Sequence, residues 1–245
     1  MRKYLIMFFV FGFLLIGCSA GALTGVVNQD ATPTDQGEIT SQAEISGDIL
    51  MLGRSVMAGW FMYWGGQGET GDLYKRDGFT LRYGHMETPP QIANSAKSLI
   101  SKFGVKSGWI VFFKFCFEDF AAGSPEEVTE TNQRNKGYVK EVYEEVCKKR
   151  GAKLIIGNAL PQVKEYTTKF LIQGHKEYNT WLLNFAKSHP GEVFIFDMYS
   201  ILTTEEGYLR PEYAASLTDS HLNNNAYRAL TRAFFPFLKK HFKVK

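Results

Sequence analysis

The sequence is poor in cysteine, in net charge and in apolar runs of membrane-spanning length. Three cysteines in 245 residues do not form the disulfide framework of a small secreted domain, so we expect Cys116 and Cys147 to be buried free thiols. The 28 Lys and Arg residues are balanced by 25 Asp and Glu residues, which argues against nucleic-acid binding. The apolar run at residues 4–17 is too short to span a bilayer. No spacing of His, Asp and Glu residues indicates a metal site.

The short apolar run belongs to a leader. Arg2 and Lys3 precede it and small residues end it, which predicts a secretory signal that is removed on export. Residues 15–18, Leu-Ile-Gly-Cys, resemble the lipobox of bacterial lipoproteins. That resemblance implies cleavage before Cys18, a lipid on Cys18, and an exported protein anchored to a membrane. An ordinary signal peptide and an uncleaved anchor are the alternatives.

The sequence divides into three parts. Residues 1–17 are the predicted signal peptide, and residues 18–47 are the lipidated cysteine with a tether. The tether is rich in Ser, Thr, Gly, Gln and Asp, so it has too little apolar surface to fold alone. Residues 48–245, roughly 200 residues, are long enough for one domain with a sizeable core.

Four short apolar runs predict strands. They are continuous rather than alternating, which is typical of parallel strands that are covered on both faces. They occupy residues 49–52, 109–113, 154–156 and 193–196. Because ligands bind at the carboxyl ends of such strands, reactive groups are expected directly after each run.

Amphipathic helical patterns alternate with these runs. They cover residues 92–103, 138–146, 178–185 and 223–238, and Pro236 is expected to kink or shorten the last one. Alternation of strand and helix predicts right-handed βαβ crossovers. The expected fold is therefore a three-layer α/β/α sandwich with a mainly parallel sheet.

A serine follows the first run. In Gly53-Arg54-Ser55, a turn between strand and helix exposes a hydroxyl beside outward-facing backbone N–H groups, as a nucleophile and an oxyanion site require. The alternative is that Gly53 only permits a tight turn and Ser55 caps the helix.

An imidazole with a nearby carboxylate precedes the last helix. Asp219 and His221 supply a base for a serine hydroxyl and an acceptor that holds the base in one tautomer. The alternative is that Asp219, Ser220 or Asn223 merely caps the helix that follows.

Together these segments resemble the SGNH (GDSL-like) hydrolases, from about residue 47 to residue 242. That family has Gly-Asp-Ser after its first strand and an Asp-x-His element before its final helix. His221-Leu222-Asn223 followed by Ala226-Tyr227 is similar to the family's sequence around its catalytic histidine. The resemblance implies the flavodoxin-like fold of these hydrolases and a cofactor-free reaction. It also implies that Ser55 is the nucleophile, His221 its base and Asp219 the acid that orients His221.

Two blocks depart from the family. Arg54 replaces the aspartate of Gly-Asp-Ser, and Glu118 stands where the family has an asparagine that donates to the oxyanion. An ionised carboxylate accepts hydrogen bonds and cannot donate one. Either Lys114 or Asn158 supplies the missing donor, or backbone N–H groups suffice, or catalysis is lost. Gly84 matches the family's second-block glycine only loosely.

The sequence thus predicts an extracytoplasmic serine hydrolase. Its expected substrates are small-molecule, glycan or lipid esters met outside the cytoplasm, and it needs no cofactor and no nucleic acid. The alternative is a non-catalytic surface binding protein that keeps the hydrolase fold, which Arg54 and Glu118 support. The sequence carries no indication of oligomeric state.

Overall fold

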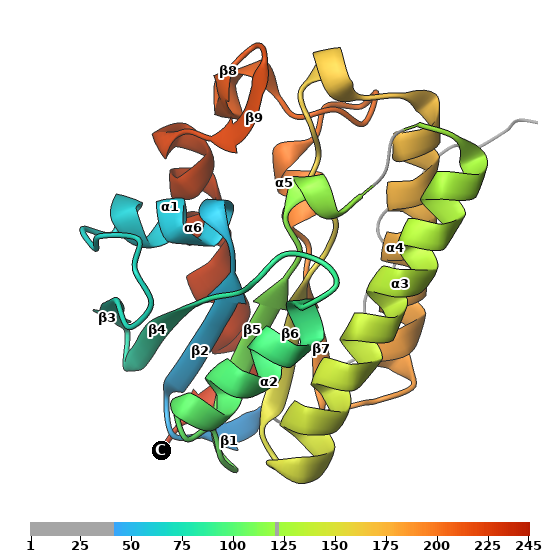
Figure 1. Ribbon diagram of the computed structural model, residues 1–245. Helices are drawn as coiled ribbons and strands as arrows, with labels where there is room; N and C mark the ends of the chain where they lie inside the picture. The colour runs from blue at the N-terminus through green and yellow to red at the C-terminus, as the bar shows by residue number, and fades with distance from the viewer. Residues whose placement is uncertain (1–41, 121–122) are drawn as a thin grey trace, which may run out of the picture. The chain divides into compact units, whose positions relative to one another are not determined.

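A six-stranded sheet forms the centre of the domain that the structure describes (Figure 1). The computed structural model describes residues 42–120 and 123–245, so the predicted signal peptide and Cys18 lie outside the described residues. The strand order is β3-β4-β2-β5-β6-β7. The parallel strands are β2 (Asp48–Gly53), β4 (Phe79–His85), β5 (Ile110–Lys114), β6 (Lys153–Gly157) and β7 (Val193–Phe196), and β3 (Leu73–Arg76) runs antiparallel to β4.

Helices cover both faces of this sheet (Figure 1). One face carries α1 (Ser55–Tyr63) and α6 (Asn224–His241), and the other carries α2 (Ile92–Lys102), α3 (Pro125–Tyr143) and α4 (Lys169–Lys187). A short helix, α5 (Met198–Leu202), follows β7. The predicted three-layer sandwich with a mainly parallel sheet is therefore confirmed. None of the helices in the described part of the chain is both long and apolar enough to cross a membrane.

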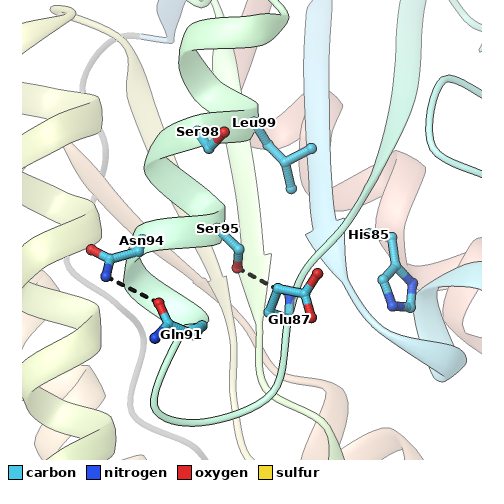
Figure 2. Close-up of a pocket in the computed structure, with 7 residues that line it drawn as sticks. All are labelled: His85, Glu87, Gln91, Asn94, Ser95, Ser98 and Leu99. Atoms are coloured by element: carbon cyan, nitrogen blue, oxygen red, sulfur yellow. Dashed lines mark hydrogen bonds between the residues drawn. The ribbon is translucent and has the colours of Figure 1, made fainter.

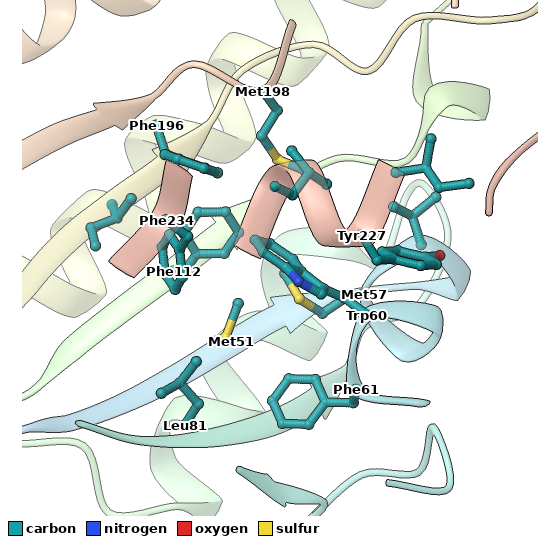
Figure 3. Packing of buried hydrophobic residues seen from close by; sticks show 14 of the residues in the cluster. Met51, Met57, Trp60, Phe61, Leu81, Phe112, Phe196, Met198, Tyr227 and Phe234 are labelled. Carbon is teal, nitrogen blue, oxygen red and sulfur yellow. The ribbon is translucent and has the colours of Figure 1, made fainter. Parts of the chain in front are cut away.

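The continuous apolar pattern of the strands follows from two cores, one on each face. In β2, Ile49 and Met51 enter the core beneath α1 and α6, whereas Leu50 and Leu52 enter the core beneath α2, α3 and α4. Successive side chains of a strand point to opposite faces, so a strand with a core on each face has no polar position. Figure 3 shows the first core, where Trp60, Phe112 and Phe234 pack together.

The sheet topology identifies one place on the carboxyl edge for a site. From β2 the chain crosses to β4 on one side and then returns past β2 to β5 on the other. The carboxyl end of β2 is therefore the switch point of the strand order, where ligands bind in open α/β sheets.

Three details differ from the sequence-based expectation. Strands β3 and β4 were not expected; β3 is exposed along most of its length, so it lacks an apolar run. Residues 43–45, within the expected tether, form strand β1 (Ala43–Ile45), which pairs with β10 (Phe242–Val244) at the other end of the chain. Regular secondary structure is therefore present before residue 48, the expected start of the domain.

The third difference is at Pro236. Helix α6 continues through this proline to His241 and is not shortened there. Leu238 and His241 are both buried beyond the proline. Burial of this last turn offsets the backbone hydrogen bond that proline cannot make.

Candidate active site

Ser55 is the first residue of α1, at the switch point of the sheet. Arg54 occupies the N-cap position, so Ser55 does not cap the helix, and its side chain is exposed. The N–H groups of Ser55 and Val56 belong to the first turn, where a helix offers no acceptor of its own. The turn into α1 is so tight that a Cβ on Gly53 would lie 2.7 Å from the Cβ of Met57. Gly53 is therefore required for the close approach that presents Ser55.

Asp219 and His221 lie on β9 (Asp219–Leu222), which forms a hairpin with β8 (Ala214–Ser216). This hairpin contacts α1 (Figure 1). Between the two residues, the Ser220 hydroxyl accepts a hydrogen bond of 3.0 Å from the backbone N–H of Val163. The strand is thus attached to the loop after β6.

Asn223 performs the capping that was the alternative role for this segment. Its side-chain oxygen accepts from the N–H groups of Asn225 and Ala226, and its amide donates to the carbonyls of Glu212 and Ala214. Asp219 and His221 are consequently not needed to begin α6.

The structure brings Ser55, His221 and Asp219 together. The Ser55 Oγ lies 3.1 Å from Nε2 of His221, across 166 residues of sequence, and the Nδ1 of His221 lies 2.7 Å from Oδ1 of Asp219. Hydrogen bonds from the backbone N–H of His221 and from its ring lower the pKa of Asp219, which is therefore ionised near neutral pH. An ionised carboxylate only accepts, so in the neutral imidazole the proton lies on Nδ1 and Nε2 presents a lone pair to the Ser55 hydroxyl.

Two side chains of the loop after β5 border this contact. The Phe117 ring packs edge to face against the imidazole of His221, with centroids 5.2 Å apart, and the Cys116 Sγ lies 3.9 Å from the Ser55 Oγ. Cys116 and Cys147 are both free and buried, as expected. The sequence did not identify Phe117 as a neighbour of His221, because the contact depends on how two loops meet.

Lys114, a candidate oxyanion donor, is the last residue of β5, and Glu118, in the position of the family's asparagine, follows that strand. The Glu118 side chain is 68% exposed and offers only acceptors. Lys114 is fully buried and donates to the carbonyl of Phe115, and burial lowers its pKa to about 8. Since a fully buried amine has no accessible surface, Lys114 is not placed to contact a substrate.

The other two candidates have structural contacts instead. Asn158 donates to Asp197 at 2.6 Å and accepts from the N–H of Tyr199 at 2.8 Å, which commits its amide to the start of α5. A Cβ on Gly84 would lie 2.8 Å from the Cδ2 of Leu52, so this glycine makes room for core packing. Of the possible donors, the backbone N–H groups at the start of α1 remain.

Arg54 and Asp119 form a buried ion pair beside the nucleophile. Their closest atoms lie 2.8 Å apart, and both side chains are more than nine-tenths buried. Burial raises the pKa of Asp119, and the Arg54 cation opposes that shift. The sequence contained one signal for this pair, since Arg54 replaces the family's aspartate and an acidic residue follows β5.

A polar hollow of about 380 Å³ opens at the carboxyl end of β4 (Figure 2). It lies near the candidate site, because His85 pairs with Gly53 in the sheet and Met86 donates to the Gly53 carbonyl. The lining side chains are mostly polar: His85, Glu87, Gln91, Asn94, Ser95, Ser98 and Leu99.

Within residues 42–120 and 123–245, no cluster of three or more His, Cys, Asp or Glu side chains could hold a metal ion.

No family model matches the sequence, and no curated protein matches it. Solved structures do share its fold. A protein assigned as an acylhydrolase from Bacteroides fragilis NCTC 9343 is 16% identical with a TM-score of 0.56, over 79% of this chain and 87% of that one. A GDSL-like lipase from Bacteroides thetaiotaomicron VPI-5482 is 15% identical with a TM-score of 0.56, over 80% of this chain and 89% of that one.

A third structure agrees with these two. A member of the lipolytic protein G-D-S-L family from Veillonella parvula DSM 2008 is 14% identical with a TM-score of 0.53, over 80% of this chain and 99% of that one. The chain therefore has the fold of the GDSL-like hydrolases, as its motifs predict.

Proposed function

We propose that this chain is a serine esterase that forms an acyl-enzyme on Ser55. The observation that carries the proposal is the 3.1 Å contact between the Ser55 hydroxyl and the Nε2 of His221. A binding protein has no need for a base held at hydrogen-bond distance from an exposed hydroxyl, whereas acyl transfer requires one.

The reaction follows from the protonation states of the three residues. Nε2 of His221 takes the Ser55 proton while Oγ attacks the ester carbonyl carbon, and Asp219 stabilises the imidazolium that forms. The imidazolium then protonates the departing alcohol. Water, deprotonated by His221, attacks the acyl-enzyme and releases the acid and Ser55.

The developing oxyanion needs donors, and the N–H groups of Ser55 and Val56 are those we assign. A side-chain oxyanion donor, such as the asparagine of the GDSL-like family, typically contributes about a hundred- to a thousandfold in rate. An enzyme that lacks this donor is therefore slow rather than inactive. The reaction rate is therefore expected to be modest.

The substrate class that we propose is an acylated glycan or similar polyol ester, in preference to a lipid ester. Support comes from the polar hollow, where Gln91, Asn94 and Ser98 present uncharged hydrogen-bonding groups. Such groups pair with sugar hydroxyls, and a fatty acyl chain would gain nothing from them.

We also propose that the protein acts outside the cytoplasm, anchored through a lipid on Cys18. This follows from the lipobox-like sequence alone. Metabolic labelling with a fatty acid tests it: the wild-type chain should be labelled and a Cys18→Ser variant should not.

A serine-directed fluorophosphonate and an ester assay test the enzymatic proposal. Full-length protein purified in detergent is incubated with the probe and, separately, with aryl acetates and acetylated sugars. Labelling at Ser55 that requires His221, with hydrolysis that is lost in Ser55→Ala, is the expected result. Equal hydrolysis by wild type and Ser55→Ala would contradict the proposal. Binding of acetylated sugar without Ser55-dependent turnover would favour a binding protein.

A further inference from the structure

The buried ion pair of Arg54 and Asp119 connects the two loops that border the candidate site. Arg54 immediately precedes Ser55, and Asp119 ends the short turn Phe117–Asp119 after β5. The Nη2 of Arg54 lies 2.8 Å from the Oδ1 of Asp119, and the two residues are 65 positions apart in the sequence. Burying two charges carries a large desolvation cost, so such a pair is a poor source of stability alone.

Both carboxylate oxygens and the carbonyl oxygen of Asp119 accept hydrogen bonds. Its Oδ2 accepts a hydrogen bond of 2.7 Å from the N–H of Cys116, and its carbonyl accepts from Asn135 at 2.8 Å and from Arg134 at 3.2 Å. Asn135 and Arg134 belong to α3. The Phe117–Asp119 turn is therefore bonded both to Arg54, which precedes the nucleophile, and to α3 on the opposite face of the sheet.

The same turn reaches the base. Phe117 packs edge to face on the His221 ring, and its carbonyl accepts a hydrogen bond of 3.1 Å from the Nε2 of Gln162. Asp219 contacts the imidazole at Nδ1, and Ser55 contacts it at Nε2. The Phe117 ring thus restricts the tilt of an imidazole that is otherwise about half exposed.

We propose that Arg54 and Asp119 are positioning residues, which join the nucleophile's turn to the Phe117 turn and so keep His221 aligned with Ser55. The inference rests on the proposed function and explains the replacement of the family's aspartate by Arg54. Misplacement of reacting groups by about 1 Å costs as much as a hundredfold in rate. Loss of the pair should therefore lower kcat while substrate binding is kept.

The kinetic test uses Arg54→Met, Asp119→Asn and the double variant in the full-length protein. At a temperature where circular dichroism shows each protein folded, we expect each single variant to lose about 10- to 100-fold in kcat. KM should stay within about twofold. The double variant should lose no more than the worse single variant, because the residues act as one unit. Arg54→Lys, which keeps the charge, should recover part of the loss.

A matched control separates positioning from general destabilisation. Glu145 is a buried acid paired with Lys149 and Arg150. It lies in the π-helical segment Glu144–Lys149, which follows α3 and precedes β6. Glu145→Gln should lower thermal stability and leave kcat unchanged. The proposal is wrong if Arg54→Met and Asp119→Asn lose no more kcat than Glu145→Gln at equal folded fraction, or if their losses multiply in the double variant.

A second measurement does not depend on activity. Phe117 shifts the ring-proton resonances of His221 through its ring current, so NMR reports whether the two rings remain in contact. We expect Asp119→Asn to move these resonances and Glu145→Gln to leave them in place. Unchanged resonances in Asp119→Asn overturn the positioning role, whereas moved resonances in a protein without Ser55-dependent hydrolysis overturn only the proposed function.

Discussion

Two polar clusters lie on the carboxyl edge of the same sheet, and they use their side chains in opposite ways. At the end of β2, Ser55 is exposed and meets His221 from the far end of the chain. At the ends of β6 and β7, Asn158 and Asp197 are engaged with each other and with the start of α5. Position on this edge is therefore insufficient to identify a site. A better guide is whether a polar side chain is exposed or is fully bonded to structural partners.

The difference arises from sequence distance. The Asn158–Asp197 cluster joins residues only 39 positions apart, after two neighbouring strands, and it only begins a helix. The Asp197 carboxylate accepts from the N–H and the hydroxyl of Ser200. The Ser55–His221 contact joins residues 166 positions apart. It does not cap a helix, because Asn223 already caps α6. A contact between distant segments that does no structural work is a strong indication of function.

The largest effect is expected for His221→Gln. Glutamine cannot take a proton, so kcat/KM for an aryl ester should fall about a thousandfold or more. The melting temperature should hardly change, because about half of the His221 side chain is exposed. His189→Gln, remote from the site, is the control, and a comparable loss there would contradict the assignment.

Stability at low pH is expected to depend on His175, which lies on α4. His175 is buried without a hydrogen-bond partner among the described residues, and burial lowers its pKa from 6.5 to about 3. Below pH 6.5 His175 is protonated in the unfolded chain, whereas in the folded chain it stays neutral down to about pH 3. The free energy of unfolding should therefore fall with decreasing pH, by at most about 1.4 kcal/mol per unit.

Denaturant titrations between pH 7 and pH 4 measure this dependence. His175→Phe should flatten it, and His189→Gln should leave it in place. An equally steep dependence in His175→Phe would show that other groups carry the acid sensitivity.

Asn158→Ala should affect stability but not chemistry. The change leaves the Tyr199 N–H without its acceptor, and we expect a loss of about 1–3 kcal/mol in the free energy of unfolding. The kcat of the folded variant should equal that of wild type. Asn184→Ala, at an exposed position on α4, should change stability by less than about 0.5 kcal/mol. A fall in kcat for Asn158→Ala would return Asn158 to the site.

The smallest effect is expected at Glu118, on the Ser55 side. Glu118→Asn adds the side-chain donor that the family has, and kcat should rise by up to about tenfold. Glu118→Ala removes the charge without adding a donor, so it separates the two causes. Equal rates in the two variants would mean that the backbone N–H groups alone hold the oxyanion.

Strands β2, β5, β6 and β7 and the principal helices were predictable because each has a local signature, and the motifs around Ser55 and His221 marked both residues as candidates. Strand β4 and the β1–β10 pair were not predictable, because none of these strands has a continuous apolar run; β4 alternates apolar and polar residues instead. The sequence left the oxyanion donor open for another reason. Lys114 ends β5 and Asn158 follows β6, but the burial of Lys114 and the hydrogen bonds of Asn158 depend on neighbours that the sequence does not place.

By itself the sequence determined the alternation of strand and helix and the chemical groups available at the strand ends, because these depend on residues close together in the chain. Only the tertiary structure decided which groups meet. The contacts of Ser55 with His221 and of Arg54 with Asp119 span 166 and 65 residues, and they form because the strand order brings loops from distant segments to one edge. Burial and hydrogen-bond partners arise only there, and they separate a reactive side chain from a structural one.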